Sequence, residues 1–471
     1  MATTLTGTAV AAAPAPASAP APASQPASRP FVRRAPPPAA AAPAPAADER
    51  APAAPTIEVH ADLQNLFLFR SDADFDRSRP RYDQSGQTAG AFATVFRPSF
   101  GFAITEHLRL FYQAEIGLNY WSKQNPDQQD PTAPDVFVMK HREIWAAGEA
   151  TDGRAGFKVG YGYFQDTTGL FLGHWLGVAQ GFVALGPRAR LSLFVGQMPD
   201  GVYEGINVTD NNFTRDIFVF GGSAVLALSD RALLAVGLHN LVDTHLVDQT
   251  RWITAPNFHL QLTRPGTFAT LEGVLQAGQL HGTALGGGAQ THLAWAAQAH
   301  VVHNLARRWE LAGNLLLLSP DDAYAGNGRS HAFFYSGKSK SATLMLTEDE
   351  IRDWYDNVDE RMSAYDGSFF MNRAGLAIAD VKLAYAATAR LRPALVVGGS
   401  TVLKPENALD HLLVGIEADA VLEWRLWPHL VAHFVVGTLV PGAAGAALLN
   451  RIDHTQMRPI WTVESSLMLR Y

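Results

Sequence analysis

The feature that most constrains the fold of this chain is a long alternation of apolar and polar residues with a period of two. In residues 251–263, for example, Trp252 and Phe258 alternate with polar residues, and residues 289–301 and 414–424 repeat the pattern. Successive side chains of a strand point to opposite faces, so each segment has one apolar and one polar face. At about 10–14 residues, the segments exceed the usual soluble strand. This pattern is typical of tilted strands that cross a bilayer with apolar side chains outward.

The connections between these segments alternate between short turns and long polar loops. Turn residues recur at eight places, at 105–107, 151–154, 185–188, 228–231, 263–266, 305–308, 388–390 and 426–429. Eight turns and nine longer loops separate 18 strands, with both chain ends on the side of the short turns. This asymmetry and the even count predict an all-β fold, a transmembrane antiparallel up-and-down barrel of about 18 strands. The spacing between the turns at 305–308 and 388–390 is long enough to contain one more hairpin, which leaves 20 strands as an alternative.

That long step contains a segment with a different period. Thr347 and Glu350 form a capping box, and apolar residues then follow at helical spacing up to Met362. We expect a helix inside a long extracellular loop over residues 319–368. This loop is expected to fold inward and narrow the mouth of the barrel.

The first 55 residues differ in composition from the rest of the chain. They hold 13 of the 28 prolines, together with many alanines. Four arginines against two acidic residues give this tail a charge of +2, so residues 56–471 carry −9 of the total of −7. Such a segment buries too little apolar surface to order itself, so we expect a disordered tail before a barrel of residues 56–471. The tail is either the remnant of an export segment or a linker.

Composition also excludes several functional classes. An acidic body is a poor nucleic-acid ligand, because affinity for nucleic acid comes mainly from phosphate neutralisation. The chain has no cysteine, which removes disulfide scaffolds and thiolate chemistry. No apolar run of ~18 residues predicts a membrane-spanning helix, and no Gly-x-Ser-x-Gly motif occurs. We therefore expect no catalysis, no cofactor and no metal site.

Two motifs point to a family. Residues 415–419 (GIEAD), a following hairpin and Val440-Pro441-Gly442 resemble the penultimate hairpin of alginate-export-type outer-membrane barrels. Residues 157–162 (FKVGYG), followed by Gly169 and Gly173, resemble an early strand and loop of that family, although its usual Arg-Gln pair is missing. The resemblance implies an 18-stranded barrel in the outer membrane of a Gram-negative bacterium. The last strand, ending in Tyr471, resembles the signal by which the barrel-assembly machinery recognises such proteins.

The alternation also selects the side chains expected to line a pore. They carry both signs of charge and comprise Arg70, Arg97, Arg109, Glu115, Lys140, Arg142, Lys158, His259, Gln261, His292, Asp380, Lys382, Glu417, Asp419 and Glu423. Basic residues concentrate on early strands and acidic residues on late ones, and facing charges of this kind set selectivity. We expect a monomeric or trimeric porin-like channel for small polar or sugar-like solutes, surrounded by outer-membrane lipid. An exporter of an alginate-like polyuronate and a soluble all-β binding protein are the alternatives.

Overall fold

The computed structural model describes 18 long strands arranged around a central space. The described residues are 55–71, 89–118, 137–198, 217–244, 249–282, 289–321, 328–333, 342–343, 374–450 and 459–471. The expected tail and the expected helix at 347–362 lie outside these ranges. The short helices η6 (Pro405–Ala408) and α3 (Ala443–Asn450) lie in two connections. No helix among the described residues is long and apolar enough to span a membrane.

The strands account for most of the described chain. Apart from the two-residue β14, they span 10 to 18 residues, as their alternating sequences predict. They are β1 (Thr56–Arg70), β2 (Ala89–Thr105), β3 (Leu108–Leu118), β4 (Phe137–Glu149), β5 (Ala155–Gln165), β6 (Gly173–Gly186), β7 (Ala189–Met198), β8 (Ile217–Ser229), β9 (Ala232–Asp243), β10 (Gln249–Arg264), β11 (Thr267–Gly282), β12 (Ala289–Ala306), β13 (Trp309–Leu318), β14 (Arg329–Ser330), β15 (Leu376–Tyr385), β16 (Leu391–Thr401), β17 (Leu413–Trp427), β18 (Leu430–Pro441) and β19 (Ile460–Arg470).

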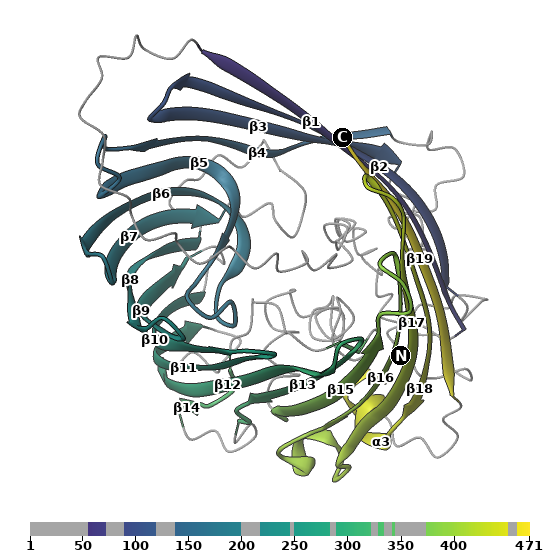
Figure 1. The fold of residues 1–471 in the computed structure, drawn as a ribbon. Coiled ribbons are helices and arrows are strands. Elements are labelled where there is room, and N and C mark those ends of the chain that lie inside the picture. The colour runs from purple at the N-terminus through teal and green to yellow at the C-terminus, as the bar shows by residue number, and fades with distance from the viewer. Residues whose placement is uncertain are drawn as a thin grey trace, which may run out of the picture.

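Antiparallel pairing joins these strands into a closed barrel (Figure 1). Each long strand pairs with its sequence neighbours, and β1 pairs with both β2 and β19. Tyr471 and Ala61 exchange two backbone hydrogen bonds of 2.9 Å at this closure. The eight predicted turns join consecutive strands, so the count of 18 strands is confirmed. β14 is an addition that runs parallel to β12 beside Thr291 and His292, beyond the end of β13.

The two faces of the barrel wall differ in polarity. Large apolar side chains such as Leu193, Leu395 and Val397 are more than half exposed on the outer face. The neighbouring positions on the same strands face inward, and many hold buried polar or charged side chains. Exposed tryptophans lie near strand ends, among them Trp309 and Trp427. An apolar outer band with aromatic residues at its edges is the surface of a membrane barrel.

One hairpin departs from the wall. The ladder between β4 and β5 ends at Ile144 and Tyr161, and the ladder between β6 and β7 ends at Gly177 and Gln197. Residues 162–165 and 173–176 therefore pair only with each other. We call residues 162–176 the arm, and Figure 1 shows this end of the hairpin curving into the barrel. The chain bends at Gly160, whose φ is +140° and where a Cβ would lie 2.2 Å from the Ile144 carbonyl oxygen.

Part of the long connection after β13 lies against the inner wall. Thr343 is 1% exposed. Its Cγ2 methyl group packs against Gly398, where an added Cβ would lie 2.4 Å from it. Ser319 Oγ accepts from the amide of Trp295 and donates to the carbonyl of His331. Thr343 therefore lies against the inner face of β16, whereas most of the connection lies outside the described ranges, so its inward fold over the mouth stays a prediction.

Candidate functional site: the inner face of the barrel

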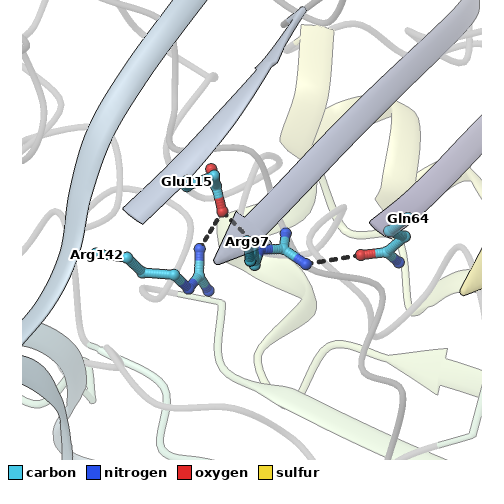
Figure 2. Close-up of polar contacts among 4 residues, drawn as sticks. All are labelled: Gln64, Arg97, Glu115 and Arg142. Atoms are coloured by element: carbon cyan, nitrogen blue, oxygen red, sulfur yellow. Dashed lines mark hydrogen bonds and ion pairs between the residues drawn. The ribbon is translucent and has the colours of Figure 1, made fainter. Parts of the chain in front are cut away.

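Four side chains from the first four strands form a network on the inner face (Figure 2). The Glu115 carboxylate accepts a hydrogen bond of 2.8 Å from Arg97 Nε and a second one from Arg142 Nη1. Arg97 Nη1 also donates to Gln64 Oε1 over 2.9 Å. The side chains of Arg97, Glu115 and Arg142 are each at most 15% exposed. Two guanidinium groups thus share the Glu115 carboxylate, and the carboxylate of Glu143 also interacts with Arg142.

A β-bulge brings Arg142 into this network. Gln113 pairs with Glu143 and Ala114 pairs with His141, so Arg142 is an extra residue on β4. A bulge of this kind re-aims a side chain without breaking the strand. The Arg142 guanidinium lies 4.5 Å from the ring centroid of Trp175, at the base of the arm. The bulge therefore connects the positive cluster on the wall to the arm.

Lys158 on β5 is a further cation on the inner face. Its Nζ lies 4.7 Å from the ring centroid of Trp145, whose Nε1 donates to Glu143 over 2.9 Å. Aromatic faces attract cations, so the ring holds the ammonium group near the wall. Arg97, Arg142 and Lys158 thus place three positive charges on the inner face of β2, β4 and β5.

Acidic side chains gather on another part of the wall, formed by β13 to β17. Ladder registers place Asn314, Asp380, Gly398 and Glu417 in one row across four strands. Asn314 Nδ2 donates to Asp380 Oδ1 over 2.7 Å. Glu417 is fully buried, and Asp419 lies two residues along on the same face at 2% exposure. Figure 1 shows β15 to β17 on a different side of the barrel from β3 and β4.

Two histidines between these regions are bonded to other polar side chains. His259 Nδ1 lies 2.5 Å from Glu272 Oε1, directly across the β10–β11 ladder. His292 Nε2 lies 3.0 Å from Gln276 Oε1, and its Nδ1 lies 3.4 Å from Ser330 Oγ on β14. Both histidines therefore hydrogen-bond to other residues of the barrel. No cluster of three or more metal-ligating side chains occurs among the described residues.

The loop at the tip of the arm carries a buried carboxylate. Asp166 accepts hydrogen bonds from Thr168 Oγ1, from the Gly169 amide and from Asn257 Nδ2 on β10, at 3.0, 2.6 and 3.1 Å. Burial raises the pKa of the Asp166 carboxyl from 3.8 to about 6, and its own hydrogen bonds oppose this rise. The following loop residues 170–172 are completely buried. The arm is thus fixed by a polar contact and by an apolar one.

The structure brings some of the fifteen predicted pore residues together and separates others. Arg97, Glu115 and Arg142 form one cluster, with Lys158 nearby, and Asp380, Glu417 and Asp419 lie within the acidic region. Arg109 is exposed close to a turn, whereas Gln261 and Glu423 are half-buried at separate inner positions. Lys382 is half-buried within the acidic region, because the ladder registers place it in one row with Val396 and Asp419. The side chains of Arg70 and Lys140 lie outside the described part of the structure. The pore-lining role of all fifteen stays a prediction.

Several polar residues of the inner face were missed. Gln64, Asn314 and Gln276 hydrogen-bond to residues at predicted positions. The alternation marks their positions as inner ones, so attention to uncharged polar residues would have found them. Asp166 carries no such signal, because its loop has no period and its partner Asn257 lies 91 residues away.

A closed barrel of 18 long strands, apolar outside and polar inside, defines an outer-membrane β-barrel of the porin type found in Gram-negative bacteria. Solved structures of Pseudomonas aeruginosa porins share this fold. OccK9 (OpdG) superimposes with a TM-score of 0.54 at 12% identity, covering 88% of this chain and 98% of that chain. OccK8 (OprE) gives 0.52 at 10% identity, with coverages of 88% and 98%. OccK11 (OpdR) gives 0.51 at 12% identity, with coverages of 88% and 95%.

The sequence comparisons do not assign the chain to a family. No protein-family model matches the chain, and no curated protein matches its sequence. The resemblance to alginate-export-type barrels is therefore not supported, although the hairpin of β17 and β18 that suggested it is present. The likeness to these solved structures is one of fold.

Proposed function

We propose that this chain forms a channel for the passive passage of small polar solutes across the outer membrane. The observation that carries the proposal is the separation of charge on the inner face. Arg97, Arg142 and Lys158 lie on early strands, and Asp380, Glu417 and Asp419 lie on late strands. Rows of opposite charge orient polar solutes and set which ions pass. A channel of this kind needs no cofactor and performs no catalysis.

The same charges argue against an exporter of an alginate-like polyuronate. A polyanion needs a cationic passage along its whole path, and three buried carboxylates on β15 and β17 would repel it. The exposed apolar band on the outer face likewise argues against a soluble binding protein, because soluble proteins rarely expose large apolar patches.

Liposome swelling tests the proposal. Refolded protein in liposomes should admit small sugars and amino acids at rates that fall steeply with solute size, and it should exclude oligouronates. Heat-modifiable mobility on a gel identifies the folded barrel in each sample. Folded protein that admits no small solute, or that admits oligouronates as fast as monosaccharides, would reject the proposal.

We also propose that the C-terminal strand is the assembly signal. Tyr471 is 86% exposed at the barrel closure, and Leu467 and Leu469 are exposed on the same face. Removing Tyr471 should lower the amount of folded barrel that cells assemble, while refolding in detergent stays efficient. Equal amounts of assembled protein in cells would refute this role.

A further inference from the structure

The rim of the barrel that carries the eight short turns is rich in arginine. These turns hold seven arginines, three acidic residues and no lysine. We call the seven the rim arginines: Arg154, Arg188, Arg231, Arg264, Arg307, Arg308 and Arg390. All of them are exposed. Because a guanidinium group stays protonated at physiological pH, this rim carries a permanent excess of positive charge.

The rim arginines occupy consecutive short turns, from the turn between β4 and β5 to the turn between β15 and β16. These strands follow one another around the wall, so the turns form one continuous arc (Figure 1). Arg188 Nη2 lies 3.9 Å from Asp230 Oδ1 of the next turn, and Arg154 Nε lies 3.7 Å from Asp152 Oδ2 in its own turn. The other five rim arginines form no ion pair with any described residue. The arc therefore presents guanidinium groups that the described chain does not neutralise.

Exposed leucines precede several of these arginines in the chain. Leu185, Leu228 and Leu305 open three of the turns and are 68%, 54% and 53% exposed. Large apolar side chains at the end of the outer band mark the boundary of the hydrocarbon layer. An arginine two or three residues farther along is at most about 10 Å from its leucine, which places it in or beside the headgroup layer. The rim arginines are thus positioned at the level of the lipid phosphates.

The opposite rim shows no such excess of positive charge in its described residues. There the described residues of the long connections, β14 included, carry more acidic than basic side chains, namely Asp166, Asp321, Glu406 and Asp410 against Arg329 and Lys404. The short turns of an outer-membrane barrel face the periplasm, so the arc lies beside the inner leaflet of the membrane.

We propose that the rim arginines bind the phosphate groups of anionic phospholipids in this inner leaflet. A lipid fits better than a soluble partner, because the charges follow the circumference of the barrel and lie next to exposed leucines. The residue type fits as well, since the planar guanidinium fork binds two phosphate oxygens at once, which an ammonium group cannot do. Basic side chains close to an anionic membrane surface strengthen the association of a protein with that surface. This binding does not depend on conduction through the barrel.

Spin-labelled lipids test this inference on the full chain, refolded into phosphatidylcholine vesicles. Electron paramagnetic resonance separates the lipids held at the protein surface from those in the bulk bilayer. Spin-labelled phosphatidylglycerol should associate with the wild type at least about twofold more strongly than spin-labelled phosphatidylcholine does. Equal association of the two lipids would overturn the inference and would leave the arc to a soluble anionic partner.

A variant that lacks the five arginines without an ion pair locates the effect on the rim. It combines the substitutions Arg231→Gln, Arg264→Gln, Arg307→Gln, Arg308→Gln and Arg390→Gln. The preference for phosphatidylglycerol should disappear in this variant, whereas lysines at the same five positions keep the charge and should keep most of the preference. Lys404→Gln, at the opposite rim, should leave the preference unchanged. A preference that survives the five glutamines, or that the lysines abolish equally, would contradict binding by the charge of the rim.

Salt provides a test on the wild type alone, which decides the matter if the glutamine variant does not fold. The Debye length falls from about 10 Å at about 0.1 M salt to about 3 Å at about 1 M, so exposed charges lose most of their attraction for a headgroup. The preference of the wild type for phosphatidylglycerol should shrink toward equal association over this range. A preference that salt does not change would overturn the inference.

Discussion

Arg97 on β2 and Glu115 on β3 face each other directly across the ladder, with Nε and Oε2 2.8 Å apart. Glu115 also neutralises part of the charge of Arg142, which a bulge inserts on the next strand. The Glu115 carboxylate therefore offsets the charge of two guanidinium groups that face the inside of the barrel (Figure 2).

Replacing Glu115 by Gln should increase the preference of the channel for anions. The change leaves both arginines charged and removes their shared counter-ion, so the reversal potential in a KCl gradient should move toward that of chloride. Losing one partner of a buried ion pair should also lower the free energy of unfolding by about 3 kcal/mol, measured in urea. Glu106→Gln, in an exposed turn, is the control and should change neither value. An unaltered reversal potential would show that this cluster does not face the ion path.

Replacing Asp380 by Asn should shift the ion selectivity in the same direction, toward anions. The carbonyl oxygen of the introduced amide can still accept the hydrogen bond from Asn314, so the wall should keep its structure while it loses one negative charge. Cation permeability relative to anions should fall, and the gel mobility of the folded barrel should not change. A rise in relative cation permeability would contradict the assignment of the acidic region to the channel wall.

Substituting Gly398 by Ala should displace the segment of the long connection that carries Thr343. A Cβ at Gly398 would lie 2.4 Å from Thr343 Cγ2, whereas at the next residue, Gly399, it would lie 3.4 Å from its nearest neighbour. A cysteine introduced by Ala342→Cys, which leaves Thr343 and its clashing methyl group in place, should react with a polar thiol reagent at least about tenfold faster in the Gly398→Ala background, because a displaced segment leaves its packed position. Gly399→Ala should leave the rate unchanged. Equal rates in the two backgrounds would place this segment elsewhere.

A lysine on the outer face should destabilise the barrel according to its depth in the bilayer. Val397, 56% exposed within β16, should cost about 2–4 kcal/mol of folding free energy when changed to Lys. Leu228, beside the turn after β8, is similarly exposed and should cost only about 0–1 kcal/mol. Folding into lipid vesicles in a urea series measures both values. Equal losses of folding free energy at the two positions would argue against an apolar outer band that faces lipid.

The sequence predicts the barrel well because its two signals repeat in every hairpin. Alternation assigns residues such as Asp380 and Glu417 to the inner face, and the turn residues set the strand count. The arm could not be predicted this way, because residues 162–165 keep the strand period while the hairpin leaves the wall at Gly160. The environment of Asp166 could not be predicted from the sequence, because it arises from burial in the folded barrel and from a hydrogen bond to a distant strand. The alternation selects Arg142 for the inner face, but it gives no sign of the bulge at this position.

The most direct test of the central claim is the conductance of the folded barrel in a planar bilayer. Protein shown to be folded by its gel mobility should insert in discrete steps of ohmic current in KCl at neutral pH. Its preference for anions should rise in Glu115→Gln and in Asp380→Asn, because each substitution removes one negative charge from the inner face. Folded, inserted protein that carries no current, or that carries current unaffected by both substitutions, would contradict a channel lined by these residues.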